Sequence, residues 1–176
     1  MSLRRSLRFL IPASAIVLGG CALFAAPPPP APARTPRPNY DLVASIRAAG
    51  EREKSIIDVT PLRDPAVTTL QEGARADERA GRYPDAAAKL DQALKLSPES
   101  PDLLQDRAEI AVRMRDFPMA EKLAHQSWSL GPKLGPLCAR NWQTVVEMRL
   151  QADDGAGAAS ARKWVQTCHK AGVNRY

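Results

Sequence analysis

The segments Gly81-Arg82-Tyr83-Pro84-Asp85-Ala86 and Arg115-Asp116-Phe117-Pro118-Met119-Ala120 are two versions of one pattern. Five pairs of matched residues lie 34 positions apart: Tyr83 and Phe117, Pro84 and Pro118, Ala86 and Ala120, Leu96 and Leu130, and Pro98 and Pro132. A repeat of about this length is typical of a helix–turn–helix unit that buries its apolar face by stacking on a neighbour. Two unrelated hairpins of equal length are the alternative, but they do not explain five matches at one spacing.

Start and stop signals divide each copy into two helices. In the first copy, Asp64 suits an N-cap, Pro65 suits the first helical turn, and Gly81 suits the left-handed position after the helix. In the second copy, Ser100 and Pro101 take the cap and first-turn positions. The sequence therefore predicts an all-α protein.

A third helical pair follows the second copy. Its first helix has an apolar stripe that includes Trp142, and Asp153-Asp154-Gly155 supplies the turn. Because Trp142 lies 38 positions after Leu104, four residues are inserted before this pair. We expect repeats at 65–98, 99–132 and 137–170, with a tail at 171–176.

The repeats resemble the tetratricopeptide repeat (TPR) family. The residues that carry the resemblance are small Ala74, Ala86, Ala93, Ala108 and Ala120, aromatic Tyr83 and Phe117, and the closing Pro98 and Pro132. Four positions depart from the family pattern: Gly73 and Arg107 replace large apolar residues, and Asp77 and Ala111 stand where Tyr is common. The resemblance implies an α-solenoid of about three repeats that binds other proteins.

The N-terminal segment has the build of an export signal. Arg4, Arg5 and Arg8 precede an apolar run, and Leu18-Gly19-Gly20-Cys21 resembles the lipobox of bacterial lipoproteins. The resemblance implies a signal peptide at 1–20, lipidation of Cys21, and, because Ala22 follows, an anchor at the periplasmic face of the outer membrane. An uncleaved membrane anchor and an ordinary secreted protein are the alternatives.

Residues 21–40 are rich in proline and predict a tether. In a polyproline II conformation of about 3.1 Å per residue, the 18 residues from Ala22 to Asn39 reach roughly 55 Å. A flexible linker and a proline-rich ligand are the alternatives.

Residues 41–64 predict an amphipathic helix over 41–58, capped by Asp41 and weakened by Gly50, and then an extended connector. We expect this helix to cover the outer side of the first repeat.

Charge and motifs argue against several function classes. The net charge is +6, but three arginines lie in 1–20, which leaves 22 basic against 19 acidic residues, so we expect no nucleic-acid partner. His125 and His169 lack partners at metal-ligand spacing, and no glycine-rich phosphate loop is present. We therefore expect no enzymatic activity, no metal and no cofactor.

The TPR resemblance implies that the first helices of the repeats line a concave groove. The family's groove positions correspond to Thr68, Gln71, Arg75, Arg79, Asp102, Gln105, Glu109, Arg113, Arg140, Gln143 and Glu147. Gln71, Gln105 and Gln143 occupy equivalent places and could bond an extended backbone, while the arginines could bind an acidic tail. A merely solvated helix face is the alternative. We expect these side chains to be exposed.

The remaining cysteines are Cys138 and Cys168. Each lies 15 residues from Asp153, at which the third hairpin turns, so an antiparallel pair places them side by side. An oxidising periplasm favours a disulfide, and two reduced, buried cysteines are the alternative.

The function that we expect is an interaction scaffold in an envelope assembly, with an unknown protein partner and a lipid contact with the membrane. The alternative is a self-associating lipoprotein without a peptide ligand.

Overall fold

The computed structural model describes residues 40–53 and 64–169, all within one compact unit, Asn39–Tyr176. In these two ranges the chain forms α-helices and no strand. The helices are α1 Leu42–Glu51, α2 Pro65–Arg79, α3 Tyr83–Leu96, α4 Pro101–Arg113, α5 Phe117–Leu130, α6 Pro136–Gln151 and α7 Gly155–Thr167. The predicted all-α class is confirmed. The predictions on the signal peptide, Cys21, the tether, the connector at 54–63 and the tail lie outside the described residues.

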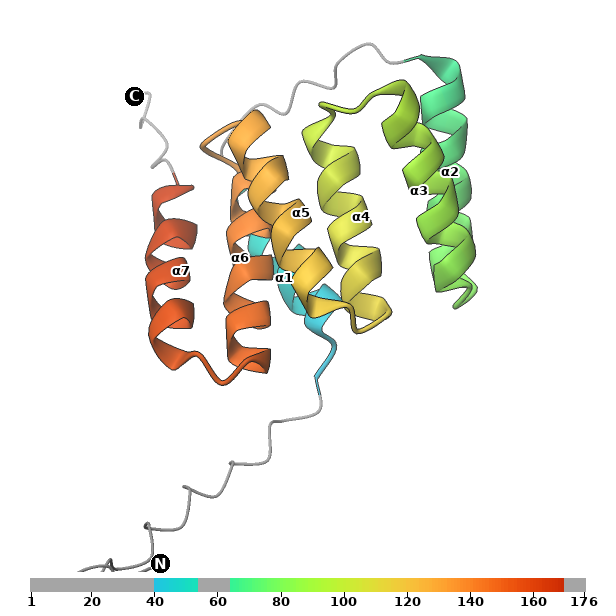
Figure 1. Cartoon of the computed structure of the whole chain (residues 1–176). Coiled ribbons are helices and arrows are strands. Elements are labelled where there is room, and N and C mark those ends of the chain that lie inside the picture. The colour runs from blue at the N-terminus through green and yellow to red at the C-terminus, as the bar shows by residue number, and fades with distance from the viewer. Residues whose placement is uncertain (1–39, 54–63, 170–176) are drawn as a thin grey trace, which may run out of the picture. The chain divides into compact units, whose positions relative to one another are not determined.

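The last six of these helices pair into three hairpins, α2 with α3, α4 with α5, and α6 with α7 (Figure 1). Each hairpin packs on the next through the α3–α4 and α5–α6 contacts. Ala74, Ala86, Ala93, Ala108 and Ala120 are all buried, with at most 2% of their surface exposed. Because a methyl side chain is short, it lets neighbouring helices approach closely.

Aspartates cap several helices. Asp64 accepts a hydrogen bond from the Ala66 backbone N–H at 2.7 Å, Asp116 from that of Met119 at 3.2 Å, and Asp154 from that of Gly157 at 2.7 Å. Such bonds satisfy N–H groups that the first turn of a helix leaves free. Ser100 is the N-cap of α4 but makes no cap bond. Its hydroxyl instead donates to Asp102 at 2.9 Å, so Ser100 takes the predicted N-cap position without a side-chain cap bond.

Each hairpin turns at a residue with a left-handed backbone. These residues are Gly81, with φ +74°, Arg115, with φ +62°, and Asp153, with φ +58°. They occupy equivalent positions, since each lies two residues after the last residue of the first helix of its hairpin. Only glycine adopts this conformation without a steric penalty, and aspartate tolerates it better than arginine does. Arg115 is therefore the residue that fits its turn least well.

We expect Arg115→Gly to raise the free energy of unfolding by about 0.5–1 kcal/mol. The substitution relieves a left-handed strain of about 1–2 kcal/mol but adds about 0.5–1 kcal/mol of chain entropy to the unfolded state. Arg115→Ala is the matched control, because it also removes the contact of the Arg115 guanidinium with the Phe117 ring, 6.0 Å away, but keeps the strain. Urea unfolding of both variants measures the difference, and equal stabilities would contradict the strain argument.

The helix that precedes the hairpins does not lie where we expected it. Helix α1 packs against α6 and α4, the first helices of the third and second hairpins. The prediction that it covers the outer side of the first repeat is therefore wrong. Its apolar residues Val43 and Ile46 instead join Ala111, Val112 and Met148 in a buried cluster.

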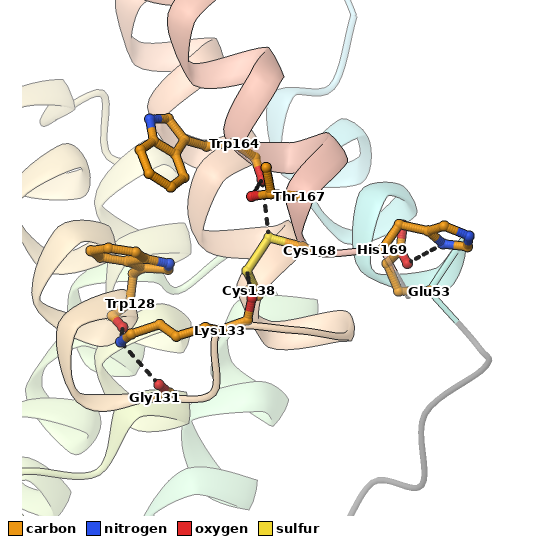
Figure 2. The surroundings of a disulfide bond; sticks show 9 residues. All are labelled: Glu53, Trp128, Gly131, Lys133, Cys138, Trp164, Thr167, Cys168 and His169. Atoms are coloured by element: carbon orange, nitrogen blue, oxygen red, sulfur yellow. Dashed lines mark hydrogen bonds and ion pairs between the residues drawn. A yellow bond between two sulfur atoms is a disulfide. The ribbon is translucent and has the colours of Figure 1, made fainter. Parts of the chain in front are cut away.

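The third hairpin carries a disulfide between Cys138, near the start of α6, and Cys168, just after α7 (Figure 2). The two Cα atoms lie 5.6 Å apart. Beside it, the Gly135 backbone N–H donates to the Cys168 carbonyl oxygen at 2.8 Å. The three tryptophans also gather here, with the Trp142 and Trp164 rings stacked at 5.2 Å between centroids.

Among the described helices, none is both long enough and apolar enough to cross a bilayer.

Candidate protein-binding site

Helix α1 lies on the surface that the groove prediction assigned to a ligand. We call this surface, formed by α2, α4 and α6, the inner face. Val43, Ile46 and Ala49 of α1 are at most 1% exposed. Gly50 allows the close approach, because a Cβ there would lie 2.8 Å from Arg140 Cγ and 3.0 Å from the Pro136 carbonyl oxygen. Helix α1 therefore fills part of the predicted groove.

Glu109 is the centre of a buried charge cluster beneath α1. Its carboxylate, 0% exposed, accepts hydrogen bonds from Arg47 Nε of α1 at 2.7 Å and from Arg140 Nε of α6 at 2.9 Å. Gln105 Nε2 also donates to Glu109, at 3.0 Å, and to Thr144, at 2.9 Å. The second arm of Arg47 reaches both carboxylate oxygens of Glu78 on α2, at 2.9 and 2.8 Å. The cluster thus ties α1 to all three helices of the inner face.

Two further contacts fix the N-terminal end of α1. Asp41 accepts two hydrogen bonds from Arg113 Nη1, each 2.8 Å long, and caps α1 by accepting from the Ala44 N–H. Glu147, 2% exposed, accepts bonds from Ser45 Oγ at 2.7 Å and from the Tyr40 hydroxyl. The two bonds to Glu147 offset the free-energy cost of burying its carboxylate, which would be high without hydrogen-bond partners.

The expectation that the groove side chains are exposed is wrong for most of them. Gln71, Gln105, Glu109 and Glu147 are buried, while Arg113 and Arg140 are partly covered and paired with acids. Gln71 donates to Asp106 at 2.8 Å and Gln143 to Glu147 at 2.8 Å, so the three amides do not form a free ladder. The exposed members of the set are Thr68, Arg75 and Arg79. Whether any of these residues contacts a partner stays a prediction.

A cleft of about 500 Å³ remains open beside α1. One wall comes from α1, through Arg47, Gly50 and Glu51, and the other from α2, through Arg75 and Arg79. The rest of the lining consists of Ala74, Glu78, Leu90, Asp106, Ile110, Pro136 and Arg140. The cleft therefore joins an apolar surface to a set of charged side chains.

The accessible charge of this cleft is mainly positive. Glu78 and Asp106 have side chains 11% and 13% exposed, and both already pair with arginines. Arg47, which pairs with Glu78, and Arg75, which pairs with Asp106, nevertheless have side chains 42% and 55% exposed. Arg79 is exposed, and its side chain has no ion pair or hydrogen bond within the described residues. Among the described residues that line the cleft, Glu51 is the only exposed acid.

The neighbouring side chains Arg140 and Gln71 hold Asp106, which lines the cleft, in its ionised form. Burial would raise the pKa of Asp106, but the Arg140 charge and hydrogen bonds from Gln71 and Arg140 outweigh it, so that pKa is lowered. A carboxylate whose pKa is lower in the folded state stabilises the fold at every pH above its unfolded-state pKa, which is about 3.9 for Asp. That stabilisation is lost as the pH falls through the folded-state pKa. Asp106 therefore stays ionised at neutral pH.

The sequence interpretation did not assign the α1 residues Tyr40, Asp41, Ser45 and Arg47 to this surface. Two sequence features could have indicated that α1 packs on this surface. Gly50 interrupts a helical pattern, and an interior glycine often marks a close approach of backbone to a neighbour. Arg47 stands next to Ile46 on the apolar side of the helix, where a charged residue needs a buried partner.

The two histidines lie elsewhere. His125 of α5 packs edge-on against Trp142, with 5.5 Å between ring centroids. His169 Nδ1 lies 2.8 Å from Glu53 Oε2, just beyond the disulfide (Figure 2). Across the part of the chain that the structure describes, no group of His, Cys, Asp and Glu side chains could hold a metal ion.

Comparisons with known proteins agree with this architecture. Residues 79–133, from the end of α2 to the loop after α5, match the model of the tetratricopeptide repeat family. The globular C-terminal domain of P. aeruginosa LpoP is similar, with a TM-score of 0.56 and 28% identity over 60% of this chain and 99% of that domain. The first TPR of Spaghetti (RPAP3), bound to the HSP90 peptide SRMEEVD, has a TM-score of 0.54 and 17% identity over 61% of this chain and 84% of that one.

No curated protein matched the chain in the sequence comparison. The repeat match and the two structures nevertheless agree on one architecture, which is also the one that the hairpins and their buried alanines form. The described part of the chain is an all-helical stack with the TPR fold, a fold for protein–protein interaction.

Proposed function

We propose that this protein is an outer-membrane lipoprotein, anchored through Cys21, whose TPR domain docks a partner protein in an envelope assembly. The fold supports a docking role, and the basic start, apolar run and lipobox-like segment of the sequence support export and lipidation. The proposal assigns no enzymatic activity and no cofactor. It places the partner contact in the cleft between α1 and α2, because α1 covers the neighbouring part of the inner face on α4 and α6.

The observation that carries the proposal is the arginine rim of this cleft. Arg75 and Arg79 lie one helical turn apart on α2, and Arg47 faces them from α1. Guanidinium groups bind carboxylates with two parallel hydrogen bonds, which favours an extended acidic segment of the partner as ligand. Leu90 and Ile110 supply an apolar surface for a neighbouring side chain. The RPAP3 domain with this fold binds a peptide, SRMEEVD, that contains three acidic residues.

Cross-linked recovery of partners from membranes tests this function. We expect Arg75→Ala combined with Arg79→Ala to lower partner recovery about tenfold or more, since each charge-assisted hydrogen bond contributes about 1.5–3 kcal/mol. The free energy of unfolding should change by no more than about 0.5 kcal/mol per substitution, because both side chains are exposed. Arg162→Ala, an exposed arginine of α7 outside the cleft, is the matched control.

Two outcomes of that experiment, and one of a separate mass measurement, would count against the proposal. Recovery that is unchanged in the double variant but lost in Arg162→Ala would place the contact on α7. Recovery of the protein with itself alone would favour the self-associating alternative. A mature protein without lipid on Cys21 by mass spectrometry would refute the anchor.

A further inference from the structure

The three tryptophans of the chain lie in one row of aromatic side chains outside the α1–α2 cleft. Trp128 comes from α5, Trp142 from α6 and Trp164 from α7. The Trp142 and Trp164 rings are stacked, and the Trp128 ring lies edge-on to both, with its centroid 5.2 Å from that of Trp142 and 6.0 Å from that of Trp164. His125 of α5 extends the row through its edge-on contact with Trp142. We call these four side chains the aromatic row.

The aromatic row lies on the side of α6 that faces away from the inner face. Trp142 follows Arg140 by two residues, a rotation of about 200° around the helix, and the Arg140 guanidinium bonds Glu109 on the inner face. Figure 2 shows the Trp128 and Trp164 rings on the same side of the disulfide. Trp164 is 45% exposed. Because ring–ring contacts already hold these side chains in place, a ligand that binds them loses little of its affinity to side-chain ordering.

An acidic group lies beyond His125, at one end of the aromatic row. Glu121 Oε1 lies 3.6 Å from His125 Nε2 and pairs with Arg149 of α6, which also pairs with Asp154 at 3.2 Å. Two carboxylates thus share one guanidinium, so these three charged groups carry an excess of one negative charge. Glu121 precedes Trp128 by seven residues, which places it about 10 Å further along the axis of α5.

A proline-rich segment that ends in an arginine matches this arrangement. In a polyproline II helix, residues three apart lie on one face and each residue adds about 3.1 Å. Such helices dock on aromatic surfaces, because they are already extended before they bind. Residues Pro29, Pro32 and Arg34 of this chain have this pattern. The midpoint of the two prolines would lie about 11 Å from Arg34, close to the separation of Trp128 from Glu121.

We propose that the aromatic row binds the proline-rich segment of a second copy of this chain. The two prolines of one copy contact Trp128 and Trp164 of the other, and the Arg34 guanidinium donates to the Glu121 carboxylate. Each copy carries both the row and the segment, so two copies form the same contact twice, and the second contact gains from the raised effective concentration within the pair. The α1–α2 cleft takes no part, so this association is independent of the partner proposed for that cleft.

A charge exchange between two full-length variants tests the contact. In Arg34→Glu the segment repels Glu121, and in Glu121→Lys the row repels Arg34. We expect each variant alone to dimerise about tenfold or more weakly than the unaltered chain, because repulsion replaces a charge-assisted hydrogen bond. An equimolar mixture should recover the dimer, since both contacts of the mixed pair then join opposite charges. Sedimentation equilibrium of the detergent-solubilised chains measures this, and Leu96→Ala, which removes an apolar side chain of α3 that is 55% exposed, is the matched control.

Tryptophan fluorescence gives a second measurement, because the three tryptophans of the chain all belong to the aromatic row. The probe is a synthetic peptide of residues 26–38, which contains no tryptophan or tyrosine. The receptor is the full-length Arg34→Glu chain, whose row is unaltered and whose own segment competes poorly. We expect a saturable change of the emission, and binding about tenfold or more weaker for the same peptide with Arg34→Glu. This measurement holds whether or not Glu121→Lys folds.

Two results would overturn the contact itself: a mixture no more dimeric than its two components, or no saturable change of the fluorescence with the probe. A third would overturn the assignment to a second copy. If the unaltered chain stays monomeric at every concentration while the probe binds the Arg34→Glu chain, the occupant is the chain's own segment or that of another protein.

Discussion

Replacement of Glu109 by alanine is expected to lower the free energy of unfolding by about 3 kcal/mol. The carboxylate accepts hydrogen bonds from Arg47, Arg140 and Gln105, and none of its own surface is exposed. Loss of one partner of a buried ion pair costs about 3–5 kcal/mol, because the other charge is left without compensation. The lower end applies here, since the Arg47 side chain is 42% exposed and can turn to water.

The matched control for this prediction is Glu72→Ala. Glu72 is an exposed acid of α2 whose side chain makes no hydrogen bond or ion pair within the described residues, so its loss should change stability by no more than about 0.5 kcal/mol. Urea unfolding followed by circular dichroism measures both variants. If Glu109→Ala were as stable as Glu72→Ala, the charge cluster beneath α1 would not contribute to the folded state.

Removal of the Cys138–Cys168 disulfide is expected to cost about 3–4 kcal/mol. The bond closes a loop with a sequence separation of 30, and in the chain-entropy model a loop of this length loses about that much unfolded-state entropy when it is cross-linked. Both cysteines are buried, so the double variant Cys138→Ala with Cys168→Ala removes the bond without burying a new polar group. Thermal and urea unfolding of this variant, compared with the oxidised protein, give the difference.

Thiol counting on the unfolded mature protein decides the oxidation state independently. With Cys21 lipidated through its sulfur, the oxidised protein should show no reactive thiol before reductant is added, and two afterwards. Two reactive thiols without reductant would show that Cys138 and Cys168 are reduced. In that case the double variant should lose far less stability than predicted.

Local sequence determined the helices and their hairpins. The 34-residue spacing between Tyr83 and Phe117 predicted the stack, because a repeated pattern of small and apolar residues defines one helical pair at a time. The caps at Asp41 and Asp64 and the left-handed Gly81 follow from chemistry within one helical turn. Interactions over such short distances along the chain are readable from composition and spacing alone.

Only the tertiary structure decided where α1 lies and which groove residues water can reach. Val43, Ile46 and Ala49 form an apolar stripe that would fit several faces of a helical stack, so periodicity could not choose among them. The choice rests on charges brought together from distant positions: Arg47 meets Glu78 and Glu109, and Ser45 meets Glu147. Their partners lie 31, 62 and 102 residues along the chain, and no local pattern encodes such pairings. Most of the side chains expected to line an open groove are therefore buried or partly covered. Glu109 and Glu147 are among them because they bond to α1, a helix that the repeat pattern does not include.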